Sequence, residues 1–231
     1  MVNEEISVTV ETNLWNAVEL VARAWTEIES MQAELAKNMA LRMEKEGNKL
    51  GFNSETGESC SEEQGDGWVR TMSIMQWGLK PKGSGKKVIG NLSIQVVLWS
   101  EEADLEIDGK IPRVEVAYFG YSTEKIGASE MGPGTWFNSE GWDYLFPNEN
   151  GSHLAWRASG DFSHGVRWDE RSNWIYSIPL VSVGCSDDID RLIISPAMKL
   201  LAGVAPIEAL KDIRTIKQCF GKDGKLHIVP K

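Results

Sequence analysis

The chain has 231 residues and a net charge of -10, and its composition is 42% hydrophobic and 25% charged. These values are typical of a folded globular protein and exclude an intrinsically disordered chain. No run of about 18 apolar residues occurs, so the sequence predicts no membrane span.

The negative charge is concentrated in the N-terminal third of the chain. Residues 1–66 contain 14 acidic and 5 basic side chains, whereas the rest of the chain contains 20 and 19. Because an acidic surface repels nucleic acids and anionic membranes, we expect neither as a partner.

The cysteine pattern and the first residues of the chain indicate in which cellular compartment we expect the protein. The three cysteines are widely spaced and form no CxxC pair, and the first residues carry acids in place of a basic signal-peptide region. Free thiols and the lack of a leader pattern predict a cytoplasmic protein.

The N-terminal part of the chain predicts a short strand and then a long helix. Alternating apolar residues over 6–10 are typical of a strand. From Asn13 to Glu46 no glycine or proline occurs, and apolar residues recur at steps of three and four, with one polar interruption at Gln32. Such a helix would be about 50 Å long. The residues of its apolar stripe are Leu14, Val18, Val21, Trp25, Ile28, Leu35 and Met39.

The apolar stripe of this helix must be covered, and two arrangements satisfy that requirement. The helix packs on the chain's own sheet, or it pairs with a second copy as in a coiled coil. Both arrangements can coexist if the C-terminal half of the helix projects from the molecule.

The central part of the chain predicts an antiparallel meander. Residues 51–67 are acidic and rich in glycine, which indicates a surface loop or linker. Residues 68–79, 88–99 and 114–118 have the alternation and the β-branched or aromatic residues of strands. A further strand is predicted around residues 178–183.

The C-terminal part predicts two helices and a last strand. A helix follows Ser186 or Asp187 and ends near Gly203, a second helix runs from Pro206 to about Gln218, and a strand spans Leu226–Val229. The fold class is therefore α+β, with a long N-terminal amphipathic helix, a mainly antiparallel sheet and C-terminal helices. We expect a strand and helix over residues 1–50, an acidic linker over 51–67 and an α+β domain over 68–231, or one merged domain.

The sharpest local motif lies between two of the predicted strands. Asp104, Glu106, Asp108 and Glu115 occupy positions 1, 3, 5 and 12 of a twelve-residue stretch with glycine at position 6. This spacing resembles the calcium-binding loop of an EF-hand, in which hard oxygen atoms converge on the ion. The flanks have the pattern of strands and not of helices, so a hairpin turn at Asp108-Gly109 is the alternative.

Half of the aromatic residues of the chain lie between residues 136 and 176, interleaved with turn formers. Flat rings next to polar residues are typical of a surface that stacks sugars or bases, and they also fill irregular cores. The candidate ligand-binding residues in this region are Trp136, Trp142, Trp156, Trp168 and Trp174.

The sequence leaves three classes of function open. The first is a non-enzymatic acidic protein that binds a protein partner through the long helix or the charged loops, or itself through the long helix. The second is a small-ligand or sugar-binding module that uses the Trp-rich region 136–176. The third is a metal-dependent hydrolase with acids from the 104–115 stretch or from residues 143–169. No cofactor is indicated apart from calcium, and the first class leads because no catalytic constellation rises above chance.

Overall fold

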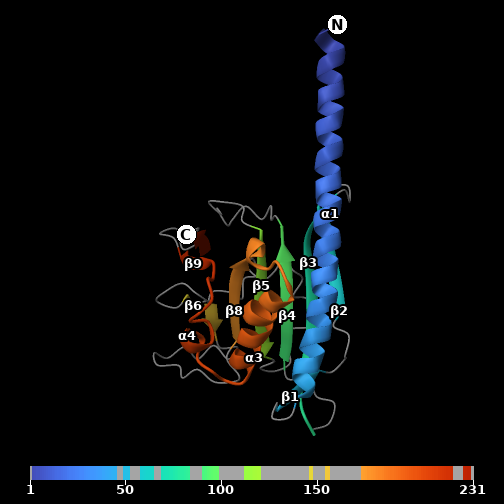
Figure 1. The fold of residues 1–231 in the computed structure, drawn as a ribbon. Helices are drawn as coiled ribbons and strands as arrows, with labels where there is room; N and C mark the ends of the chain where they lie inside the picture. The colour runs from blue at the N-terminus through green and yellow to red at the C-terminus, as the bar shows by residue number, and fades with distance from the viewer. Residues whose placement is uncertain are drawn as a thin grey trace.

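The fold is seen in a computed structural model, which describes residues 2–45, 49–52, 58–64, 69–83, 90–98, 112–120, 146–147, 154–156, 173–220 and 226–229. A long helix, α1 (Val2–Glu44), stands beside a mainly antiparallel sheet, and short helices follow near the C-terminus (Figure 1). The predicted α+β class is thereby confirmed.

Eight of the described strands form one sheet in the order β1-β3-β4-β5-β8-β7-β6, with β2 also paired to β3. All described pairings are antiparallel, and β3, β4 and β5 form the predicted meander. The strands are β1 (Leu50–Phe52), β2 (Glu58–Gln64), β3 (Val69–Pro81), β4 (Gly90–Val97), β5 (Arg113–Gly120), β6 (Phe146–Pro147), β7 (Leu154–Trp156) and β8 (Asn173–Pro179). A separate pair is formed by β9 (Lys217–Phe220) and β10 (Leu226–Val229).

One hydrophobic core lies between the sheet and the helices. Alternate residues of the central strands, such as Ile94, Val116 and Tyr176, face the same side and are buried with the stripe of α1. The anchored part of α1 and the sheet therefore share one core.

The C-terminal helices pack on the same face as α1. Three consecutive segments, α2 (Ser186–Asp188), η3 (Ile189–Ile194) and α3 (Ser195–Leu201), form one helical run whose middle segment is π-helical. The hydroxyl of Tyr176 lies 3.2 and 3.1 Å from the carbonyl oxygens of Leu192 and Ile193 in this segment. The hydroxyl thus forms hydrogen bonds with carbonyl groups that the wider π-turn leaves available as acceptors. Burial raises the pKa of Tyr176, so the hydroxyl stays protonated and can donate.

Two predictions for the N-terminal region are wrong. Residues 6–10, predicted as a strand, belong to α1, because β-branched residues cost a helix only tenths of a kcal/mol each and no glycine or proline stops it there. Residues 58–64, predicted as part of a loop, form β2, which pairs with β3 along Val69–Gln76. The backbone groups at the edge of β3 can pair with a polar segment as well as with an apolar one.

A third correction concerns the C-terminal helix that was predicted from Pro206 to Gln218. The observed helix α4 spans only Pro206–Ala209. The chain then turns, and the amide of Ile216 donates a hydrogen bond of 2.7 Å to the carbonyl of Ser177 in β8. This contact with the sheet replaces the next helical turns and leads into β9. The strand predicted around 178–183 also ends earlier, at Pro179, and a 3-10 turn, η2 (Leu180–Ser182), follows.

The part of α1 that projects is the N-terminal half and not the C-terminal half. Figure 1 shows the helix rising well beyond the sheet at its N-terminal end, whereas its C-terminal end lies against the body of the molecule. The C-terminal end is held by Arg42, whose guanidinium donates to both carboxylate oxygens of Asp190 at 2.8 Å. Ser195 also donates to this carboxylate, at 2.9 Å.

Candidate functional site

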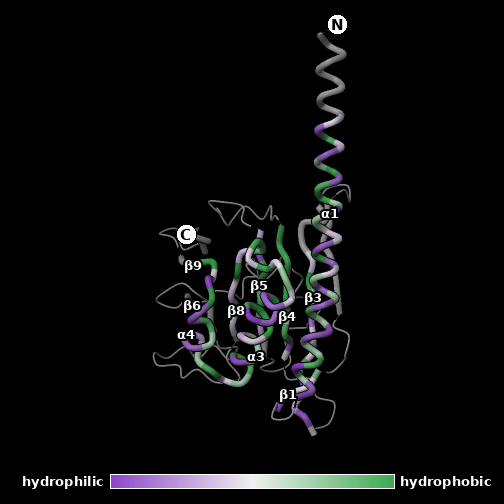
Figure 2. The backbone as a smooth tube through the Cα atoms, viewed as in Figure 1, coloured by the Kyte–Doolittle hydropathy of each residue, from purple (hydrophilic) through white to green (hydrophobic). Residues whose placement is uncertain are grey.

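Four of the seven large apolar side chains that are exposed in the described part of the chain lie on the N-terminal part of α1. Leu14 is 62% exposed, Trp15 70%, Val18 47% and Leu20 69%. We call residues 2–20 of α1 the arm. Figure 2 shows apolar positions recurring along the described part of the arm, above the level of the sheet. Exposed apolar side chains on consecutive turns of one helix are typical of a protein–protein contact surface.

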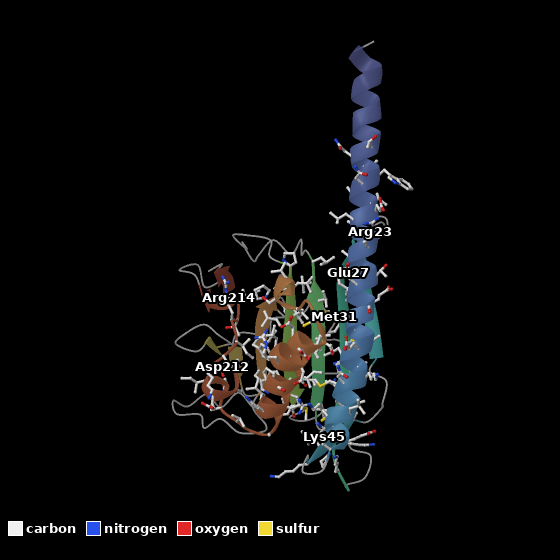
Figure 3. All side chains as sticks on the ribbon, in the orientation of Figure 1. Arg23, Glu27, Met31, Lys45, Asp212 and Arg214 are labelled. Atoms are coloured by element: carbon white, nitrogen blue, oxygen red, sulfur yellow. The ribbon has the colours of Figure 1, made fainter. Side chains whose placement is uncertain are left out.

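The apolar stripe passes from the arm into the core without a break. Val21 is partly buried against the core, and Trp25 and Ile28 are fully part of it. Figure 3 shows Arg23 near the level at which α1 meets the rest of the molecule, and Met31 beside the sheet. The sheet therefore covers the stripe from about Val21 onward, and the arm carries the uncovered remainder.

Polar contacts fix the anchored half of α1 in one register on the sheet. The side-chain amide of Gln32, the predicted interruption in the stripe, donates to the hydroxyl of Ser73 at 3.0 Å. The guanidinium of Arg42 binds Asp190 at the far end of the helix. Partial burial opposes ionisation of Asp190, but the hydrogen bonds from Arg42 and Ser195 outweigh it and lower the pKa of this carboxyl.

An ion pair at the base of the arm lies away from the apolar stripe. Glu19 and Arg23 form an ion pair one helical turn apart. At 100° per residue, Glu19 lies about 140° and Arg23 about 180° around the helix from Leu14. The stripe through Leu14 and Val18 is therefore free of these charges.

A second unusual surface is the face of the sheet opposite to α1. The register places Gln95, Glu115 and Ser177 side by side on β4, β5 and β8, and Ser93 lies two residues from Gln95 on the same face. All four are buried. Antiparallel sheets commonly leave such a polar face to water, so its burial is the feature that sequence alternation did not predict.

An ion pair lies in this buried polar row. The Nε of Arg113 donates to Oε1 of Glu115 at 2.5 Å, and Glu115 is completely buried. Within the described part of the chain, Oε2 of Glu115 and the hydroxyl of Ser93 have no hydrogen-bond partner. The two opposite charges cancel, so the row is polar without a net charge.

The predicted calcium ligands fall mostly outside the described residues. Asp104, Glu106 and Asp108 lie in the range 101–111, which is not described. Glu115, the fourth residue of the motif, lies in β5 and pairs with Arg113. Among the described residues, no group of three His, Cys, Asp or Glu side chains lies close enough together to hold a metal ion.

The predicted Trp-rich surface is described at only two of its five positions. Trp136, Trp142 and Trp168 lie outside the described residues, and Trp156 contributes its backbone to β7. Trp174 is buried in the core, with its ring centroid 6.1 Å from those of Tyr118 and Tyr176. Ligand binding by this region stays a prediction.

Cys185 is an exposed free thiol at the start of the C-terminal helical run. Its Sγ lies 3.3 Å from Oδ2 of Asp188, whose other oxygen binds Arg191. Bonds from Arg191, Cys185 and the Gly184 amide lower the pKa of Asp188. These contacts close the first turn of the helix.

Comparisons with known proteins found no matching family model, no matching curated protein and no matching solved structure. No described helix is both long and apolar enough to cross a membrane.

Proposed function

We propose that this chain is a non-enzymatic protein-interaction protein that associates with a second copy of itself through the arm of α1. The observation that carries the proposal is the exposure of Leu14, Trp15, Val18 and Leu20 on one free-standing stretch of helix. Tryptophan is enriched among the residues that dominate binding energy at interfaces.

The free-standing geometry itself supports a partner. Isolated helices shorter than about 12–15 residues are marginal in water even when they are rich in alanine. The arm, at 19 residues, exceeds that length, but it contains β-branched residues such as Thr12 and Val18, which lower helix propensity. Helices in proteins owe most of their stability to packing of an apolar face, so a packing partner would stabilise the arm.

The exposed area allows an estimate of affinity. Full burial of a Leu or Val side chain is worth about 1.5–3 kcal/mol, so the exposed parts of Leu14 and Val18 supply about 1–2 kcal/mol each. Two copies would then gain about 4–8 kcal/mol, against an association cost of at least about 4 kcal/mol. A flanking contact from Trp15, about 100° around the helix from Leu14, adds to this gain. We expect a weak dimer, with a Kd of about a millimolar.

The test is sedimentation velocity over a wide range of protein concentrations. The natural chain should shift from monomer to dimer as concentration rises. Leu14→Glu, which places a charge in the centre of the stripe, should remain monomeric at every concentration because the carboxylate would lose its hydration without a partner.

Leu41→Glu is the matched control. Leu41 is also an exposed leucine of α1, but it lies about 180° around the helix from Leu14. It should dimerise like the natural chain. A natural chain that stays monomeric at millimolar concentration, or a Leu41→Glu variant that loses the dimer as completely as Leu14→Glu, would contradict the proposal.

A further inference from the structure

A proline interrupts the hydrogen-bond ladder of the C-terminal helical run. Pro196 lies in the first turn of α3, directly after the π-helical segment η3. In an α-helix the amide of residue 196 would donate to the carbonyl of Leu192, but proline has no N–H and its ring clashes with that carbonyl. The run therefore cannot pass this point as a regular α-helix, and the wider π-turn of η3 relieves the conflict.

The hydroxyl of Tyr176 stands in for the donor that Pro196 lacks. Tyr176 is a buried residue of β8, and its hydroxyl lies 3.2 Å from the carbonyl oxygen of Leu192 and 3.1 Å from that of Ile193. Because a buried carbonyl without a donor is costly, this contact stabilises the π-turn over an arrangement that points the carbonyls elsewhere. A side chain of the sheet thus helps to determine the backbone conformation of η3.

The π-turn brings Asp190 and Ser195 together. The amide of Ser195 donates to the carbonyl of Asp190, five residues earlier, which is the hydrogen bond of a π-helix. The hydroxyl of Ser195 also donates to the carboxylate of Asp190, at 2.9 Å. In an α-helix two residues five positions apart point about 140° away from each other, so the contact between the two side chains would be lost.

The carboxylate that the π-turn orients is the one that binds α1. A terminal nitrogen of Arg42 lies 2.8 Å from each carboxylate oxygen of Asp190 and 3.5 Å from the hydroxyl of Ser195. Lys45, directly after α1, adds a further positive charge near this carboxylate. Asp190 and Ser195 can face Arg42 together only in the π-helical register.

We infer that Tyr176 is a positioning residue, whose hydroxyl maintains the π-turn and thereby orients Asp190 to hold the C-terminal end of α1 through Arg42. The conformation of η3 thus couples strand β8 to the long helix. This inference does not depend on the proposed function, because it concerns the anchored end of α1 and not the arm.

The experiment is a double-mutant cycle of Arg42→Met and Asp190→Asn, measured by urea unfolding at neutral pH. The cycle gives the coupling free energy of the Arg42–Asp190 pair, and it is measured in the natural chain and in a Tyr176→Phe background. Tyr176→Phe removes the hydroxyl and keeps the buried ring. The coupling should be present in the natural chain and largely lost in the Tyr176→Phe background, because Asp190 would no longer be oriented toward Arg42.

Tyr118→Phe is the matched control background. Tyr118 is a second buried tyrosine of the same sheet, on β5, and its substitution should leave the Arg42–Asp190 coupling unchanged. A merely structural role of Tyr176 would lower the stability of every member of the cycle equally and would keep the coupling. A coupling that persists in the Tyr176→Phe background, or that is lost equally in the Tyr118→Phe background, would overturn the inference.

Pro196→Ala tests the cause of the π-turn separately. This variant supplies the missing N–H and removes the ring, so the run can form the α-helical bond to Leu192, and the Arg42–Asp190 coupling should fall. A coupling that is unchanged in Pro196→Ala but lost in Tyr176→Phe would overturn the role of the proline and support that of Tyr176. A natural chain without measurable coupling would overturn the whole arrangement.

Discussion

The buried ion pair between Arg113 and Glu115 allows a quantitative test of the sheet's polar face. Both side chains are almost completely removed from water, and the Nε of Arg113 lies 2.5 Å from Oε1 of Glu115. Removing one partner of a buried pair leaves the other charge uncompensated, which costs about 3–5 kcal/mol. We therefore expect Glu115→Gln and Arg113→Met each to lower the free energy of unfolding by about this amount. That is a large part of the roughly 5–15 kcal/mol that holds a domain folded.

The double variant Arg113→Met/Glu115→Leu distinguishes two costs in the free energy of unfolding: the loss of the ion pair and the burial of an unpaired charge. Replacing a buried pair by apolar residues of similar volume is often neutral or stabilising by about 1–4 kcal/mol. The double variant should thus be clearly more stable than either single variant.

Urea unfolding, followed by circular dichroism and tryptophan fluorescence at low protein concentration, measures the free energy of unfolding of all three variants. The control is Glu208→Gln, which removes an exposed ion pair with Lys211 and should leave the midpoint unchanged. Single variants that lose less than about 1 kcal/mol would refute the reasoning, because that is the range of solvent-exposed pairs.

Two further predictions concern the anchoring of α1. Leu35→Ala removes a completely buried side chain between α1 and the sheet and should cost about 2–5 kcal/mol in urea unfolding, whereas Leu41→Ala at an exposed site should cost about 0.5 kcal/mol or less. Equal effects would mean that α1 is not packed on the sheet. Arg42→Met should destabilise the protein at neutral pH, and this difference from the natural chain should shrink below about pH 4. The sign follows from the lowered pKa of Asp190: its ion pair contributes above the unfolded-state pKa and is lost as Asp190 is protonated. A difference that stays constant down to pH 2 would contradict this assignment.

Local patterns predicted the elements whose structure depends on local properties. The alternation of Leu92, Ile94 and Val96 is a period of two within one strand, and β4 has that face in the core. The stripe of α1 is likewise a local property, and most of it is buried as expected. These elements could be predicted because pattern and propensity agree with the final packing.

The failures involve contacts between residues far apart in the chain. The end of α4 depends on the hydrogen bond from Ile216 to Ser177, and β2 exists because β3 offers it an edge. The sequence did not indicate which half of α1 projects, because the C-terminal end is anchored by the contact of Arg42 with Asp190, which lies 148 residues away in the sequence. The sequence alternation of β4 and β5 shows that one face of these strands is polar. The burial of that polar face depends on the segments that cover it, and alternation within a strand does not predict those.

The length of α1 is the feature that connects the fold to the proposed function. The 43 residues of α1 form a helix of about 65 Å, whereas β3, the longest described strand, has 13 residues and spans about 43 Å. The anchored part from Trp25 to Met43 needs only about 28 Å of helix to bury its stripe on the sheet. A helix that served only this domain could begin near Val21. The arm instead continues the same stripe for two further turns with Leu14 and Val18 exposed. The arm therefore presents an apolar surface on the same helix face as the buried stripe, but the sheet does not extend far enough to cover it. A second copy of the same arm can cover this surface.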